Sequence, residues 1–158
     1  IRTGQGPEKG RERMAEREAT AVWEGTLTEG KGRFTVGSGA IPEQAVTWKA
    51  RTEEPGGLTS PEELIAAAHA SCYAMALAYA LQSAGHPAER LTVTAQVGFG
   101  PKPGGGMKVT HSHLRVRGKV PGLDQERFAE LAREGEQGCP VSNALRNNVE
   151  ITLEATLE

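Results

Sequence analysis

One long apolar segment with a defined start and end constrains the fold more than any other feature. Residues 60–63 (SPEE) suit a helix start, with a serine N-cap, proline at the first helical position and acidic residues at the positive end of the helix dipole. Gly85 and the proline after it suit a helix end, so we expect a helix from residue 61 to about residue 84. Its interior, residues 64–81, is apolar nearly all the way round, and such a helix must be covered by other elements.

Strand-like alternation of apolar and polar residues flanks this helix on both sides. We expect short strands at residues 21–27, 33–36, 45–51, 91–99, 107–118 and 149–157, with a helix at 124–137 and a short helix beginning at Pro140. The strand at 107–118 changes its alternation partway, which predicts a bulge or a change of face. Strands, a long helix, strands, two helices and a strand predict an α+β fold with a mainly antiparallel sheet.

The length of 158 residues corresponds to one domain, which we place at residues 21–158. Residues 1–20 are rich in Gly, Pro and charge and predict a flexible arm, in which Met14 is a candidate natural start and residues 1–13 a candidate added leader. A chain of this size has difficulty covering a central helix on every side. A homodimer would solve this, because the alanines at 66, 67, 68, 70 and 76 allow close helix approach.

Charge and hydropathy argue against two classes of partner. The 18 Lys and Arg residues against 20 Asp and Glu residues give a net charge of -2, which disfavours nucleic acid. No apolar run reaches the ~20 residues of a membrane span without polar breaks, and no secretion signal is present in these residues. We therefore expect a cytoplasmic protein without a membrane partner.

Two cysteines carry the candidate chemistry. Cys72 and Cys139 form no CxxC motif, and a reducing cytoplasm disfavours a structural disulfide, so they are either inert buried thiols or redox-active ones. Cys72 lies in the middle of the expected helix, where burial keeps a thiol pKa high unless a cation is supplied. Cys139 precedes Pro140 at a helix start, where a thiol pKa is lowered.

The two cysteine segments together resemble known sequence motifs. Residues 60–77 (SPEELIAAAHASCYAMAL) and 138–145 (GCPVSNAL) are similar to the two motifs of the OsmC/Ohr hydroperoxide reductases, and residues 23–25 (WEG) are similar to the OsmC branch. The resemblance covers the chain from Met14 to its end. It implies an OsmC-like fold in an intertwined homodimer, with two sites at the subunit interface.

The resemblance also implies an activity. It makes the protein a thiol peroxidase for organic hydroperoxides, with Cys72 as the peroxidatic cysteine, Cys139 as the resolving cysteine, and Arg51 and Glu62 as the remaining site residues. It implies no metal or other cofactor. The reductant would be a dithiol, with the dihydrolipoyl group of a lipoylated protein as the candidate.

Physical chemistry makes these roles intelligible. Arg51 would be the cation that a buried Cys72 lacks, and Glu62 would orient it. Ten residues separate Glu62 from Cys72, which is ~15 Å along a straight helix and excludes direct contact. Either Arg51 spans this distance, or Arg51 and Glu62 come from the partner subunit. We favour the second arrangement.

Three other hypotheses are compatible with the sequence. His69 and Cys72 could join His111 and His113 around zinc. The cysteine pair could belong to a non-catalytic redox sensor or binding module. The chain could also be a structural α+β protein with inert thiols.

Overall fold

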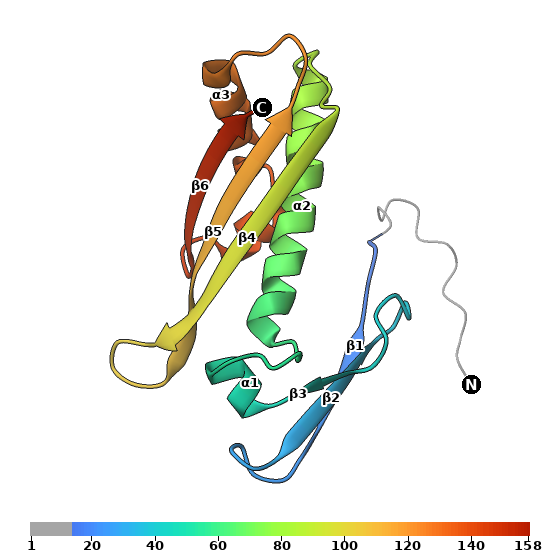
Figure 1. Cartoon of the computed structure of the whole chain (residues 1–158), viewed down its shortest axis with the longest axis vertical. Coiled ribbons are helices and arrows are strands. Elements are labelled where there is room, and N and C mark those ends of the chain that lie inside the picture. Colours follow the sequence, from blue (N-terminus) through green and yellow to red (C-terminus); the bar gives the residue numbers. More distant parts are fainter. Residues whose placement is uncertain (1–13) are drawn as a thin grey trace, which may run out of the picture.

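The computed structural model describes residues 14–158. The candidate leader at 1–13, and with it most of the expected flexible arm at 1–20, lies outside the described residues. The fold is α+β, as predicted: within residues 14–158 a long helix, α2 (Pro61–Ser83), is accompanied by two three-stranded sheets and three shorter helices. Figure 1 shows α2 as the axis of the molecule, with the larger sheet along one side and the smaller sheet displaced beyond the start of α2.

The smaller sheet is the predicted N-terminal meander. Strands β1 (Ala19–Glu24), β2 (Lys31–Val36) and β3 (Gln44–Val46) pair antiparallel in chain order. Within residues 14–158 this sheet makes few contacts with the rest of the molecule. One face of it therefore stays unpartnered in a single chain.

The expected strand at 45–51 is wrong in its second half. The strand ends at Val46, and Trp48–Thr52 forms a short helix, α1. The reason is local, because the Thr47 hydroxyl accepts the backbone N–H of Ala50 at 3.1 Å and so caps a helical turn. As a result Arg51 projects from a short helix, which residues 53–60 connect to α2, and not from a strand.

The predicted limits of α2 are confirmed. The Ser60 hydroxyl accepts the backbone N–H of Glu63 at 3.2 Å, and Pro61 is the first helical residue. Beyond the C-cap residue Ala84, Gly85 has a φ of +83°, a left-handed conformation that favours glycine.

The larger sheet contains β4 (Arg90–Pro101), β5 (Met107–Lys119) and β6 (Glu150–Leu157). Strands β4 and β5 pair antiparallel, whereas β6 pairs parallel to β5 after a crossover through α3 (Gln125–Gln137) and α4 (Pro140–Leu145). The predicted irregularity in β5 is present: Val97 and Phe99 of β4 face Ser112 and Val109 of β5, so β5 carries one extra residue there.

The core lies between the inner face of this sheet, one face of α2, and α3. Its fully buried members come from all of these elements: Tyr73, Leu77, Leu81, Leu114, Val116, Phe128 and Leu131. The opposite face of α2 is open in a single chain, where the side chains of Met75 and Tyr79 are 68% and 73% exposed. By length and composition alone α2 is apolar enough to cross a membrane, and the helix at the core of a globular fold passes the same test.

Candidate active site

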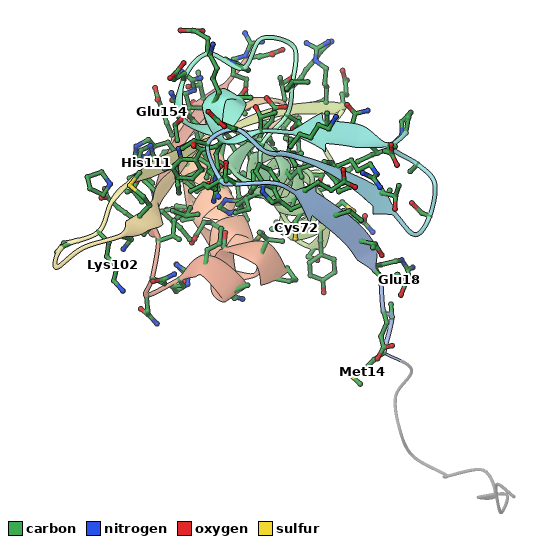
Figure 2. All side chains as sticks on the ribbon, turned by 90° about the horizontal axis from the view of Figure 1, so that it is seen from below. Met14, Glu18, Cys72, Lys102, His111 and Glu154 are labelled. Atoms are coloured by element: carbon green, nitrogen blue, oxygen red, sulfur yellow. The ribbon has the colours of Figure 1, made fainter. Side chains whose placement is uncertain are left out.

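Cys72 lies halfway along α2, on the side that packs against the core and α4. Its side chain is partly buried, and its thiol is free. Burial raises the pKa of this thiol; a backbone hydrogen bond from Val141 in α4 acts in the opposite direction, and the neighbouring Cys139 adds to the rise. Figure 2 shows Cys72 toward the middle of the molecule, whereas Lys102 lies on the projecting turn between β4 and β5.

Cys139 is fully buried and begins α4. It is the N-cap residue, and its Sγ accepts the backbone N–H of Ser142 at 3.5 Å. Because Pro140 has no N–H, the first two amides that α4 offers belong to Val141 and Ser142. The Val141 amide donates to the sulfur of Cys72, and the Ser142 amide donates to the sulfur of Cys139. The first turn of α4 therefore faces both sulfur atoms.

Arg51 and Glu62 form a second cluster at the start of α2. The Arg51 guanidinium donates to the Glu62 carboxylate through Nη2 at 2.8 Å and through Nε at 3.2 Å. Glu62 is buried, and the guanidinium carbon stands 4.2 Å from the centre of the Phe99 ring. These residues line a pocket of about 380 Å³ that also includes Ala66 and Val97.

The structure thus brings the four predicted residues together as two separate pairs. Cys72 and Cys139 meet between α2 and α4, whereas Arg51 and Glu62 meet between α1 and α2. Since α2 is one continuous helix, the ~15 Å of axial distance between Glu62 and Cys72 stands. Arg51 points its charge at Glu62 of its own chain, so a single chain leaves Cys72 without a cation from Arg51.

A third cluster surrounds His69, one turn before Cys72 in α2. Its fully buried imidazole meets the Ser112 hydroxyl at Nδ1, 2.6 Å away, and the Ser142 hydroxyl at Nε2, 2.7 Å away. Burial lowers the pKa of His69, which the carboxylate of Glu136 opposes and Arg146 reinforces. The imidazole is therefore neutral at physiological pH, and it donates through one nitrogen and accepts through the other.

The His69 cluster also bears on the zinc hypothesis. Ser112 reaches His69 from the inner face of β5, so its neighbours His111 and His113 point to the outer face. The rings of His111 and His113 stack on each other there, 4.3 Å apart. Because both His69 nitrogens already bond to serines, the four residues of that hypothesis are not brought together.

Sequence reasoning missed the two serines. Ser142 lies within the second cysteine motif, so its position beside Cys139 is a signal that could have singled it out. Ser112 gives no such signal, because only the pairing of β4 with β5 and the packing of α2 bring it to His69.

Sequence comparison finds similar proteins over most of the chain. The family model described as OsmC-like protein matches residues 54–154. Peroxiredoxin OsmC from Escherichia coli K12 is 38% identical over 138 residues, which cover 87% of this chain and 94% of that protein. The organic hydroperoxide resistance protein from Xanthomonas axonopodis pv. citri is 34% identical over 131 residues, covering 81% of this chain and 89% of that protein.

Solved structures show the same fold. An organic hydroperoxide resistance protein from Elizabethkingia anophelis aligns with a TM-score of 0.77 and 29% identity, covering 94% of this chain and 100% of that one. The protein OhrB of Bacillus subtilis aligns with a TM-score of 0.71 and 26% identity, covering 88% of this chain and 98% of that one. The family match, the identities and the fold agree, and the chain belongs to the OsmC family.

Proposed function

We propose that this protein is a cysteine-based peroxidase that reduces organic hydroperoxides to alcohols in defence against oxidative stress. The observation that carries the proposal is the meeting of two free thiols, Cys72 and Cys139, at the first turn of α4. The relatives named peroxiredoxin and organic hydroperoxide resistance protein support the same class of reaction.

The proposed cycle has three balanced steps. The thiolate of Cys72 attacks the terminal oxygen of ROOH, the O–O bond breaks, and the alkoxide takes a proton to leave as alcohol. The Cys139 sulfur then attacks the resulting sulfenic acid, the S–O bond breaks, and hydroxide leaves as water with the Cys139 proton. A dithiol reduces the disulfide, returning two thiols and becoming a disulfide itself.

The first step needs a cation beside Cys72, because burial raises the pKa of that thiol in the single chain. We place Arg51 of a second copy there, with Glu62 of the same second copy holding the guanidinium. Two features support an intertwined homodimer. The face of α2 that carries Met75 and Tyr79 is open, and the sheet β1–β3 makes few contacts with its own chain within residues 14–158.

The surroundings of Arg51 favour an organic substrate. Its guanidinium lies over the Phe99 ring, and Trp48 packs edge-on against that ring with the centroids 6.1 Å apart. An alkyl or aryl group of the peroxide gains apolar contact there that hydrogen peroxide does not. The reductant in this proposal is a dithiol, with a lipoylated protein as the cellular candidate, and the site of action is the cytoplasm.

Steady-state turnover tests the proposal. Wild type, Cys72→Ser and Cys139→Ser are assayed with cumene hydroperoxide, tert-butyl hydroperoxide and hydrogen peroxide in excess dithiol. We expect wild type to prefer the organic peroxides and Cys72→Ser to be inactive. Cys139→Ser should form a Cys72 sulfenic acid once and then stall or over-oxidise. Equal turnover by Cys72→Ser and wild type would refute the proposal.

A redox sensor is the second candidate, and the burial of Cys139 favours it, because a reductant has little access to a fully buried sulfur. A sensor would form the Cys72–Cys139 disulfide with peroxide but would not sustain turnover with excess dithiol. The same assay distinguishes the two functions, since a peroxidase consumes many equivalents of peroxide per chain.

A further inference from the structure

His69 is a buried polar side chain that the proposed cycle does not use. It occupies the same face of α2 as Cys72, three residues earlier, and it has no access to solvent. A buried imidazole with both nitrogens satisfied is held in one orientation, because losing either partner leaves a polar atom without a hydrogen bond.

The imidazole joins α2 to α4. Among residues 14–158, the bond from His69 Nε2 to the Ser142 hydroxyl is the one hydrogen bond between side chains of these two helices. Ser142 is also the residue whose backbone N–H reaches Cys139 Sγ. The chain of contacts therefore runs from α2 through His69 and Ser142 to the sulfur of Cys139.

The other anchor of α4 does not fix it against α2. Arg146, just after α4, donates to the carboxylate of Glu136 at 2.8 Å, and this ion pair closes the corner between α3 and α4. It sets the path of the chain around Cys139, but it leaves the distance from Cys139 to Cys72 to the contacts between α4 and α2. Among those contacts, His69 supplies the hydrogen bond to a side chain of α4, beside the backbone hydrogen bond from Val141 to the sulfur of Cys72.

We propose that His69 is a positioning residue that holds Cys139 against Cys72 through Ser142, and so sets how often the Cys72 sulfenic acid is resolved as a disulfide before it is over-oxidised. This inference rests on the proposed peroxidase function. In the resolving step the S–S bond forms as the S–O bond of the sulfenic acid breaks, and water leaves. A sulfur misplaced by a fraction of an ångström loses most of its effective concentration in such a step.

The first test is a single-turnover experiment with one equivalent of cumene hydroperoxide and no dithiol. Samples are trapped with dimedone over time, and intact-mass spectrometry separates sulfenic acid, disulfide and sulfinic acid. In Ser142→Ala we expect the ratio of disulfide formation to sulfenic acid formation to fall about tenfold. In a parallel sample with excess peroxide, this variant should accumulate sulfinic acid. The matched control is Tyr73→Phe, which removes a buried hydrogen bond of 2.9 Å from α2 to Ala132 of α3. It should resolve like wild type.

A pair of substitutions at residue 69 tests whether the Nε2 nitrogen, which bonds to Ser142, carries the effect. The glutamine amide reaches the position of the histidine Nε2, whereas the asparagine amide reaches only that of Nδ1. His69→Gln should therefore retain the Ser142 bond and much of the disulfide yield, and His69→Asn should lose it. A purely structural role predicts that disulfide yield follows the thermal stability of the two variants and not the nitrogen they imitate.

A redox titration in glutathione buffers gives a readout that needs no peroxide. It measures the effective concentration of Cys139 toward Cys72, which we expect to be about tenfold lower in Ser142→Ala and unchanged in Tyr73→Phe. Wild-type resolution and effective concentration in a folded Ser142→Ala would overturn the role of His69 and leave the peroxidase proposal intact. A wild-type chain that forms neither sulfenic acid nor disulfide with peroxide would overturn both.

Discussion

Arg51 is held from two directions by groups of different character. A buried carboxylate, Glu62, accepts two of its N–H groups, and the Phe99 ring lies against the guanidinium. Such a bidentate, partly desolvated pair fixes orientation as well as charge. Orientation matters here because, in the proposed dimer, this guanidinium must face a sulfur on another chain.

Replacing Glu62 tests that orientation. Glu62→Gln keeps the size of the side chain but removes the charge, so Arg51 stays cationic and loses its fixed direction. We expect kcat/KM for cumene hydroperoxide to fall about tenfold. The matched control is Glu24→Gln, which breaks the exposed ion pair with Arg33 at 3.5 Å and should leave turnover unchanged. Wild-type kcat/KM in Glu62→Gln would show that Arg51 needs no such support.

The buried His69 imidazole predicts a pH dependence of stability. Its pKa in the folded chain is lowered from the ordinary value of 6.5, mainly by burial. Below pH 6.5, the ordinary pKa of histidine, residue 69 of the unfolded chain binds a proton that the buried imidazole of the folded chain does not readily accept. The free energy of unfolding therefore falls as the pH drops, by at most about 1.4 kcal/mol per pH unit. Well above pH 6.5 the imidazole is neutral in both states, and its contribution to stability no longer changes with pH.

Urea unfolding at pH 7 and pH 5.5 measures this effect. We expect wild type to lose more stability on acidification than His69→Gln, which has no imidazole to protonate. His86→Gln removes a histidine outside the His69 cluster and should lose as much stability as wild type between pH 7 and pH 5.5. Equal losses in wild type and His69→Gln would mean that the buried imidazole accepts its proton without cost.

At the scale of elements, the approach of α3 to α2 depends on one glycine. A Cβ on Gly135 would lie 3.0 Å from the backbone Cα of Leu77 and 3.2 Å from its Cβ. Backbone atoms of a core helix cannot move aside as the end of a flexible side chain can. The two helices that cover the larger sheet are therefore in contact at the closest distance their backbones allow.

We expect Gly135→Ala to lower the free energy of unfolding by roughly 1–3 kcal/mol, although alanine is the better helix former. Chemical denaturation measures the change. Gly138→Ala is the matched control, because a Cβ there would meet Glu134 O at an ordinary 3.6 Å. A Gly135→Ala protein as stable as wild type would mean that the two helices separate easily.

Local sequence signals predicted most helices and strands, whereas contacts between residues far apart in sequence could not be predicted. The limits of α2 follow from residues 60–63 and Gly85, which act within a turn of the chain. The helix at Trp48–Thr52 was mistaken for a strand, because alternation over a few residues does not reveal a threonine cap. The parallel pairing of β6 with β5 and the bonds of His69 join residues far apart in sequence, and no local pattern encodes them.

The candidate site also contains features that were predictable from the sequence and features that were not. Cys72, Cys139 and Glu62 came from the two cysteine motifs, and Arg51 came from the family resemblance upstream of the first motif. Helix geometry correctly separated Glu62 from Cys72. The pairing of Arg51 with Glu62 was expected, whereas the helical turn that presents Arg51 was not, because residues 45–51 were predicted as a strand.

At the scale of the whole molecule, the unpartnered surfaces and the two separated pairs lead to one prediction. If each site combines Arg51 of one chain with Cys72 of the other, two inactive proteins should complement each other. Mixing Arg51→Ala with Cys72→Ser under conditions of subunit exchange should restore about a quarter of wild-type turnover, since half of the dimers are mixed and each has one complete site. Size-exclusion chromatography with light scattering checks the dimer.

The cysteine pair supplies the control for that mixture. Cys72 and Cys139 meet within one chain, so Cys72→Ser mixed with Cys139→Ser should recover no sustained turnover. Recovery in this control would place the two cysteines of one site on different chains. No recovery in the first mixture would place Arg51 and Cys72 of one site on the same chain.

The atom that would bond Cys72 is also the acceptor that starts α4. Once joined to Cys72, this sulfur would be turned toward its new partner and accept the Ser142 amide proton less well. A helix of six residues has few internal bonds with which to compensate. Solvent exchange at one backbone amide therefore becomes a gauge of oxidation state, which nuclear magnetic resonance could follow in an intact sample through successive rounds of peroxide and dithiol.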